Sequence, residues 1–149
     1  MAHYAEIDEN NIVINVFSGI DEDQLDDLPE EFTSWEEFYT DLKGNTVKRT
    51  SYNTSKNEHK VEGKTAFRAN YAGIGYSYDP ENDVFIQPAK SDQEVLNTNT
   101  WTYDPPNTKP TPENDNQDYA WDPPSSSWIL IDLKDPADFD WDGTNEDNF

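Results

Sequence analysis

The feature that most constrains what this chain can fold into is an aromatic frame that recurs along it. Residues 76–80 read Tyr-Ser-Tyr-Asp-Pro and residues 119–123 read Tyr-Ala-Trp-Asp-Pro. In both copies another aromatic follows the central one by seven positions, from 78 to 85 and from 121 to 128. Residues two apart on a strand share a face, and Asp and Pro favour a turn. The frame therefore predicts β-hairpins in which rings pair across the turn.

The central copy belongs to a longer segment, residues 68–88. We expect strands over 71–78 and 84–86, with Pro88 ending the pairing because proline donates no backbone hydrogen bond. A partial copy, Trp-Thr-Tyr-Asp-Pro, occupies residues 101–105. Two interpretations of the rings are open: they hold structural hairpins together, or they line a surface that binds sugars or a partner protein.

The first half of the chain predicts a further sheet and a helix. Residues 3–7 and 12–17 flank a turn-rich connector, and we expect the second of these strands, the most apolar segment, at the centre of a sheet. Apolar residues spaced three and four apart, with Ser34 as a cap and Gly44 as a terminator, predict a helix over 35–43. Residues 46–52 predict a strand, and residues 53–64 form a polar loop that is either simply solvated or a docking surface.

These elements predict an α+β or mainly β fold, with antiparallel hairpins, one short helix and an extended acidic C-terminal tail. We expect a compact antiparallel sheet domain over residues 1–103, a proline-rich linker over 104–118, an aromatic hairpin over 119–131 and the acidic tail over 132–149. Only 33% of the residues are hydrophobic, but 5 Trp, 8 Tyr and 7 Phe are present. Any core is therefore expected to be small and aromatic.

The net charge of −22 is segregated along the chain. Residues 1–42 hold 13 acids and no base, residues 43–75 hold 7 bases and 2 acids, and residues 76–149 hold 17 acids and 3 bases. Such a pattern suggests attraction within the chain or between copies, and it argues against nucleic acid or an acidic membrane as a partner. We expect Lys48, Arg49 and Arg68 of the basic segment to contact an acidic partner surface.

The tail combines acids with isolated rings, a composition that commonly anchors on another protein. Phe139, Trp141 and Phe149 are therefore candidate partner-binding residues. Residues 138–143 match the opening of an EF-hand calcium loop, but position twelve would be Phe149 in place of a bidentate glutamate. Calcium binding is disfavoured for that reason.

No arrangement of residues points to catalysis. The chain has no cysteine, its two histidines lack partners at metal-ligand spacing, and Gly73 and Gly75 precede neither a third spaced glycine nor a helix. We expect no catalytic residue, no cofactor and no metal. Strong negative charge also suits a DNA mimic, but mimicry would not need the aromatic hairpins. Without an apolar span or a secretory signal, synthesis in a cytoplasm is expected.

Four segments resemble a family of small acidic virion structural proteins of marine tailed phages, especially phages of cyanobacteria. They are Met-Ala-His-Tyr-Ala-Glu-Ile-Asp at 1–8, Lys-Arg-Thr-Ser-Tyr-Asn-Thr at 48–54, the segment 65–79, and 119–128 with its closing Ser-Trp. The resemblance implies a non-enzymatic particle protein that is made in the host cytoplasm. Its expected partners are other virion proteins, and self-association is a further option. It implies either a decoration or cement protein on the capsid exterior, or a tail-fibre or baseplate module that recognises a host receptor or glycan.

Overall fold

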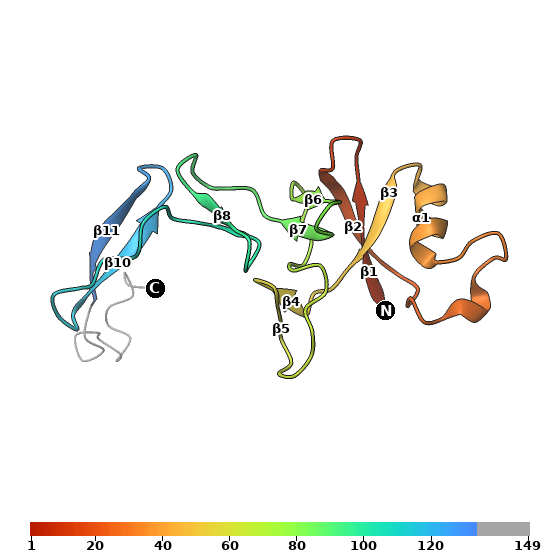
Figure 1. Cartoon of the computed structure of the whole chain (residues 1–149), viewed down its shortest axis with the longest axis horizontal. Coiled ribbons are helices and arrows are strands. Elements are labelled where there is room, and N and C mark those ends of the chain that lie inside the picture. Colours follow the sequence, from red (N-terminus) through yellow and green to blue (C-terminus); the bar gives the residue numbers. More distant parts are fainter. Residues whose placement is uncertain (134–149) are drawn as a thin grey trace, which may run out of the picture. The chain divides into compact units, whose positions relative to one another are not determined.

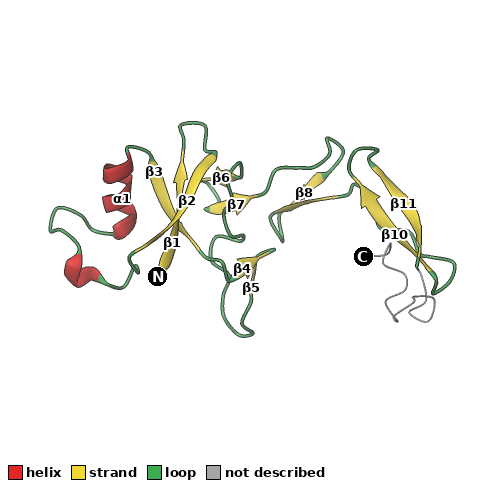
Figure 2. Cartoon of the chain, turned by 180° about the vertical axis from the view of Figure 1, so that it is seen from behind, coloured by secondary structure: helices red, strands yellow, loops and turns green. Residues whose placement is uncertain are grey.

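The computed structural model describes residues 1–133, whose contacts divide into two units (Figure 1). Of the described residues, the first unit comprises 1–89 and 95–104, and the second comprises 90–94 and 105–133. Within the described residues, antiparallel hairpins and one α-helix dominate (Figure 2), which confirms the expected α+β or mainly β class. The predicted tail over 132–149 lies outside the described residues from 134 onward, and Asp132 still belongs to a strand.

An antiparallel sheet of order β2-β1-β3 begins the first unit, with β1 at Ala2–Ile7, β2 at Val13–Gly19 and β3 at Thr46–Thr50. The prediction that β2 is central is wrong, because β1 lies between the other two strands. The reason is that β1 is buried on both faces: Tyr4 enters one apolar cluster, and Ala5 and Ile7 enter another. In contrast, Ile14 of β2 is exposed.

The predicted helix is confirmed at the expected bounds, as α1 at Trp35–Lys43. The Ser34 side chain accepts a hydrogen bond from the backbone N–H of Glu37, and Gly44 ends the helix in the left-handed region at φ 77°. The Glu37 carboxylate accepts in return from the N–H of Thr33, one residue before the position that a capping box uses. A short 3-10 helix, η1 at Leu25–Asp27, precedes α1, and Trp35 buries its ring while its Nε1 donates to the Gln24 carbonyl at 2.9 Å.

Within residues 1–133, three successive hairpins share one plan. They are β6 (Ser77–Asp79) with β7 (Val84–Ile86), β8 (Val95–Asn97) with β9 (Thr102–Asp104), and β10 (Gln117–Asp122) with β11 (Ser127–Asp132). In each hairpin, one cross-strand pair joins residues seven positions apart. These pairs are Tyr78 with Phe85, Leu96 with Tyr103, and Trp121 with Trp128. The expected ring pairs are confirmed, with centroids 5.2 Å apart for Tyr78 and Phe85 and 5.6 Å apart for Trp121 and Trp128.

Two details of the predicted frame are wrong. Residues 71–76 are not a strand, because Arg68 and Ala69 turn the chain at positive φ and the segment that follows packs as a loop against β2. The partial copy at 101–105 does not open a hairpin either. Tyr103 lies on a return strand, opposite Leu96, a partner that no aromatic spacing reveals.

The turns explain why the spacing is constant. Each hairpin closes on a pair five positions apart, and the last loop residue adopts positive φ: 56° at Asp83, 57° at Trp101 and 50° at Ser126. The residue before each loop is Asp79, Asn97 or Asp122, and its side-chain oxygen accepts a hydrogen bond from a loop N–H. At Asp79 the hydrogen bonds from Asn82 hold the carboxyl pKa below its ordinary value.

A shorter hairpin interrupts the loop expected over 53–64. It joins β4 (Thr54–Ser55) to β5 (Glu58–His59) through Lys56 and Asn57, which both have positive φ and so form a type I′ turn. The remainder of the segment, residues 60–64, lies between strands and is exposed.

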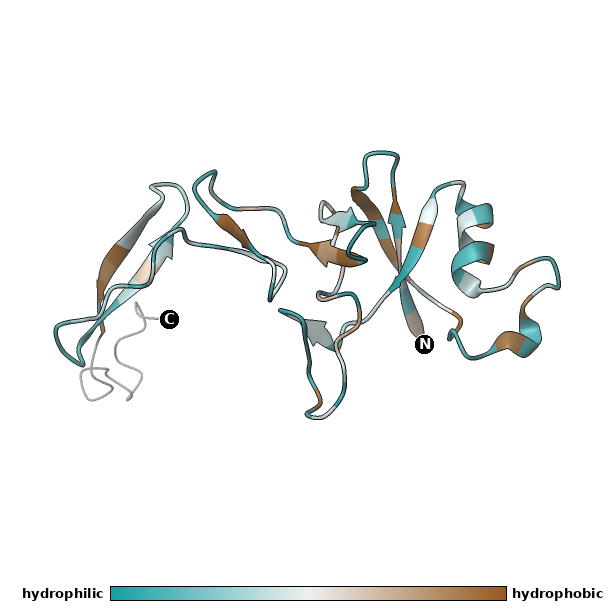
Figure 3. Cartoon of the chain, viewed as in Figure 1, coloured by the Kyte–Doolittle hydropathy of each residue, from teal (hydrophilic) through white to brown (hydrophobic). Residues whose placement is uncertain are grey.

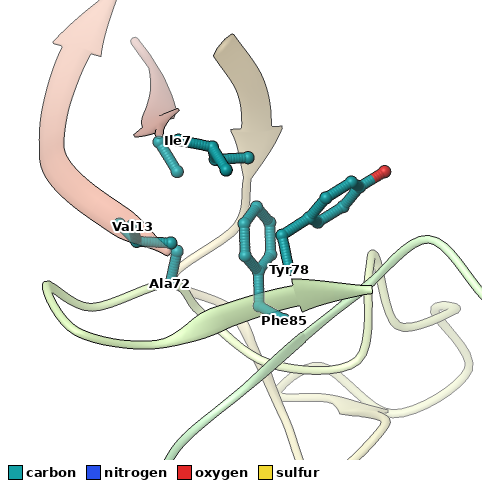
Figure 4. Packing of buried hydrophobic residues seen from close by; sticks show 6 residues of the cluster. Ile7, Val13, Ala72, Tyr78 and Phe85 are labelled. Atoms are coloured by element: carbon teal, nitrogen blue, oxygen red, sulfur yellow. The ribbon is translucent and has the colours of Figure 1, made fainter. Parts of the chain in front are cut away.

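The β6–β7 hairpin supplies the ring at the middle of one apolar cluster of the first unit. Figure 4 shows the Phe85 ring rising from this hairpin toward Ile7, with Val13 and Ala72 on one side of it and Tyr78 on the other. Phe85 is fully buried. The sheet and the first of the three hairpins therefore fold around a shared aromatic core.

The common plan allows a matched stability test, because Phe85 and Tyr103 occupy equivalent return-strand positions with exposed fractions of 0% and 38%. We expect Phe85→Ala to lower the free energy of unfolding by about 3–5 kcal/mol through the cavity it leaves. Tyr103→Ala should cost less than about 1 kcal/mol, since water already reaches that ring. Chemical denaturation of both variants measures the difference. Equal effects would show that the contribution of the ring to stability depends on its position in the hairpin and not on its burial.

Candidate partner-binding surfaces

Arg68 lies at the centre of an ion network inside the first unit. Its Nη1 is 2.5 Å from Glu36 Oε2 and its Nε is 2.7 Å from Asp83 Oδ1, while its side chain is only 10% exposed. The same Nη1 donates to the Arg49 carbonyl oxygen at 2.8 Å. One guanidinium therefore joins α1, β3 and the turn between β6 and β7.

Glu36 completes the network from the first turn of α1. Its carboxylate accepts a hydrogen bond from the backbone N–H of Arg49 at 2.5 Å, in addition to the ion pair with Arg68. Asp83 also accepts from the hydroxyl of Tyr78, whose ring packs on Phe85. The polar network and the aromatic core thus share a residue, so neither can rearrange independently.

The titratable groups with shifted pKa values cluster around this network. Burial acts to lower the pKa of Arg68, but its hydrogen bonds and ion pairs with Glu36 and Asp83 outweigh burial and raise it. Burial and the hydrogen bond to Asp83 raise the pKa of Tyr78, and burial together with the charge of Glu22 raises the pKa of Tyr4. Each of these groups has a structural partner, so the shifts do not mark a reactive centre.

The structure separates the three basic residues predicted to bind a partner. Arg68 is enclosed by its own chain, which contradicts its expected place on a docking surface. The Arg49 guanidinium lies 3.8 Å from the centroid of the Phe67 ring, and Lys48 lies half-buried on β3. No pattern in the sequence distinguished Arg68, because its partners are 32 and 15 positions away.

A group of accessible positive charges lies on the segment around β4 and β5. Lys56, Lys60 and Lys64 are exposed there and form no ion pair with any residue of 1–133. Lys60 Nζ lies 5.6 Å from the ring centroid of Tyr52, which is itself exposed. We call Lys56, Lys60 and Lys64 the lysine loop.

Near the N-terminus an open cleft of about 430 Å³ borders the same region. Its lining comes from 1–3, 21–23 and 49–53. His3 of β1 lies edge-on to the rings of Tyr52 and Tyr71, with centroids 5.3 and 5.8 Å away. Among the described residues, no group of His, Cys, Asp or Glu is placed to hold a metal ion, and no helix has the length and apolar character to cross a membrane.

In the second unit, the two faces of the β10–β11 hairpin differ. Trp121 Nε1 donates to the Glu94 carboxylate at 2.8 Å, and Trp128 Nε1 donates to the Asn107 carbonyl at 3.3 Å, so chain from outside the hairpin contacts the indole face. The other face carries Ile129 and Ile131, which are exposed. The aromatic spacing predicted a hairpin over 119–131 but gave no sign that one of its faces is apolar and exposed.

The remaining predicted partner-binding residues, Phe139, Trp141 and Phe149, lie outside the described residues, as does the partial calcium-loop match at 138–143. A scan against protein-family models and searches of curated proteins and of solved structures found no match to this chain. The candidate surfaces therefore stand on the geometry of this molecule and on the resemblance of its segments.

The Arg68 network gives a test with a matched control. Arg68→Met removes the positive charge and leaves Glu36 and Asp83 without their partner, so we expect the free energy of unfolding to fall by about 2–4 kcal/mol. Lys48→Met makes the same change of charge at a residue with no ion pair in the described part and should stay within about 0.5 kcal/mol of the parent. Urea unfolding of the two variants is the measurement, and equal stabilities would mean that the network does not hold the elements together.

Glu22, which lines the cleft, predicts a pH dependence. Burial, and then the charge of Glu36, raise its pKa in the folded protein, against the opposing effects of Arg49 and Arg68. The folded state therefore keeps the Glu22 proton to a higher pH than the unfolded chain does, and stability is lost as pH rises through the folded pKa.

Glu22→Gln cannot ionise and should raise Tm at pH 7, with the gain vanishing below the ordinary glutamate pKa of about 4.3. Glu9→Gln, at an exposed turn, is the control. Thermal unfolding across pH measures both; a gain for Glu22→Gln that persists at low pH would refute the role of ionisation.

Proposed function

We propose that this chain is a non-enzymatic structural component of a tailed-phage virion, displayed on the capsid exterior as a decoration or cement protein. The observation that carries the proposal is the tandem hairpin plan. One turn design is used three times within residues 1–133. Both members of the central pair are buried in β6–β7, whereas Tyr103 of the pair in β8–β9 is accessible. A repeated hairpin whose central side chains are buried in one copy and accessible in another suits a protein that binds other proteins better than one that assembles a reaction site.

The location of the resembling segments supports the same proposal. Residues 1–8 and 48–54 contain β1 and part of β3, residues 65–79 end in β6, and residues 119–128 span the turn of the β10–β11 hairpin. The likeness to virion proteins therefore covers the sheet and two of the three hairpins. The strongly shifted groups, Arg68 and Tyr78, are committed to holding the fold. The accessible features are charge and apolar surface, which are the components of protein–protein contacts.

A second candidate is a tail-fibre or baseplate module that binds a receptor or glycan. Its supporting observation is the ring cluster of His3, Tyr52 and Tyr71, where Tyr52 is exposed and Lys60 lies over its ring. Exposed rings beside polar groups suit carbohydrate stacking. Tyr52→Ala would weaken glycan binding under this candidate and leave particle attachment unchanged under the first.

Copy number on purified particles separates the two locations. Quantitative mass spectrometry should find on the order of hundreds of copies for a capsid protein, because a shell repeats its sites by symmetry, and at most a few dozen for a tail module. Detection in infected cells but never in purified virions would overturn the structural assignment itself.

The lysine loop predicts how the protein attaches. If it docks on an acidic particle surface, changing Lys56, Lys60 and Lys64 together to Glu should lower occupancy at least about tenfold at low salt, and added salt should weaken the parent protein. The same three residues changed to Arg keep the charge and should retain occupancy. Counting copies bound to particles that lack the protein is the measurement, with circular dichroism to verify folding. Full occupancy of the folded Glu variant would exclude this surface as the contact.

A further inference from the structure

Strand β11 presents an apolar surface and an open edge that the rest of the described chain does not cover. Ile129, Leu130, Ile131 and Leu133 are 44%, 48%, 41% and 47% exposed. Figure 3 shows part of this strand in the brown of hydrophobic residues. A two-stranded hairpin is marginal by itself in water, and further strands with a shared apolar face stabilise it.

The hydrogen-bond pattern identifies which backbone groups point outward. Leu133 N–H donates to the Asn116 carbonyl across the hairpin at 2.6 Å. Because antiparallel pairs alternate between bonded and non-bonded, the bonded positions of β11 are 127, 129, 131 and 133. The N–H and C=O groups of Trp128, Leu130 and Asp132 therefore face the outer edge, where no described residue pairs with them.

The opposite edge of the hairpin is protected and β11 is not. On β10 the outward N–H of Tyr119 is occupied by the Asp118 carboxylate at 2.8 Å, and Asp118 is paired with Lys109 at 2.8 Å. Residues 127–131 of β11 carry no charge, no proline and no glycine, which are the devices that normally block an exposed edge. An uncharged edge of this length is unusual in a chain of net charge −22.

We propose that β11 pairs antiparallel with β11 of a second copy of this chain, forming a continuous four-stranded sheet across a two-fold axis. The register follows from charge and from the number of strand residues that are paired, because an axis at Trp128 would pair only 127–129 within the strand. Centring the axis on Leu130 pairs Leu130 with its equivalent, Ile129 with Ile131 of the other copy, and Asp132 with Trp128. Centring it on Asp132 would place two carboxylates opposite each other, which is destabilising.

The Leu130 register also satisfies the backbone. Leu130 has its N–H and C=O on the open edge, so two copies can exchange both hydrogen bonds at the axis, as a bonded antiparallel pair requires. All seven residues from 127 to 133 find a partner, and the alternate positions 129, 131 and 133 of both copies form one apolar face. This inference does not depend on the virion proposal, since it concerns contacts between identical chains.

Salt distinguishes this contact from docking through the lysine loop. Two copies of charge −22 repel each other, and the screening length falls from about 10 Å at 0.1 M ionic strength to about 3 Å at 1 M. Apolar pairing on an uncharged edge should therefore strengthen with salt. A contact made by opposite charges should weaken under the same change.

The test is sedimentation velocity of the full chain over a concentration series at low and high salt. We expect a reversible monomer–dimer equilibrium that shifts toward dimer as salt rises. Leu130→Lys places like charges at the axis and should raise the dimer dissociation constant at least about tenfold. Ile74→Lys, the same kind of change at an exposed apolar residue of the first unit, should leave it unchanged.

Two further measurements separate loss of pairing from loss of folding. Leu130→Pro removes an outward N–H without removing a hydrogen bond to β10, so it should abolish the dimer and retain the near-ultraviolet circular dichroism of the Trp121–Trp128 pair. In the parent protein, the amides of Trp128, Leu130 and Asp132 should gain hydrogen-exchange protection as concentration rises. A protein that is monomeric at every concentration and salt, a dimer unaffected by the Leu130 variants, or a dimer that dissociates in high salt would overturn the proposal.

Discussion

The contacts of one guanidinium coordinate the first unit. Arg68 reaches Glu36 on the helix, Asp83 in a hairpin turn and the backbone of Arg49 on β3, and so connects three elements that are distant in sequence. A small core with few aliphatic residues cannot set the positions of these elements through packing area alone. Buried charge supplies the missing specificity here, because each carboxylate has a geometrically suitable partner and an unpartnered charge would be costly. The positive φ of Arg68, 53°, is a local cost that these interactions offset.

The three hairpins share one turn geometry but lie in different environments. An Asx side chain before the loop and a left-handed residue at its end determine the turn, and the cross-strand pair seven positions apart follows from that geometry. Environment then decides what the pair does. Phe85 meets the N-terminal strands and becomes core, while Tyr103 remains open to solvent. Turn chemistry is thus conserved along the chain while the contribution of the rings changes with position.

The same distinction explains what could be predicted from sequence. Ser34, Glu37 and Gly44 act through local contacts at the ends of the helix, so the helix and its bounds could be predicted from the sequence. The ring spacing of seven identified two hairpins. The central position of β1 could not be predicted, because it arises from burial on both faces by residues far along the chain. Nor could the β8–β9 hairpin, whose central pair includes Leu96 in place of a ring. For the candidate surfaces, charge counts located the basic segment but could not separate enclosed Arg68 from exposed Lys60.

Charge segregation and the apolar edge constrain each other. Acidic surfaces of two copies repel each other in a chain of net charge −22, whereas the five residues from 127 to 131 form an uncharged stretch on an open edge. Contacts with a different, acidic protein require positive charge, and the exposed lysines near β4 and β5 supply it. Because the two features belong to different units, they need not compete for the same surface. Ionic strength then acts on them in opposite directions, by reducing repulsion between copies and by screening attraction to a partner.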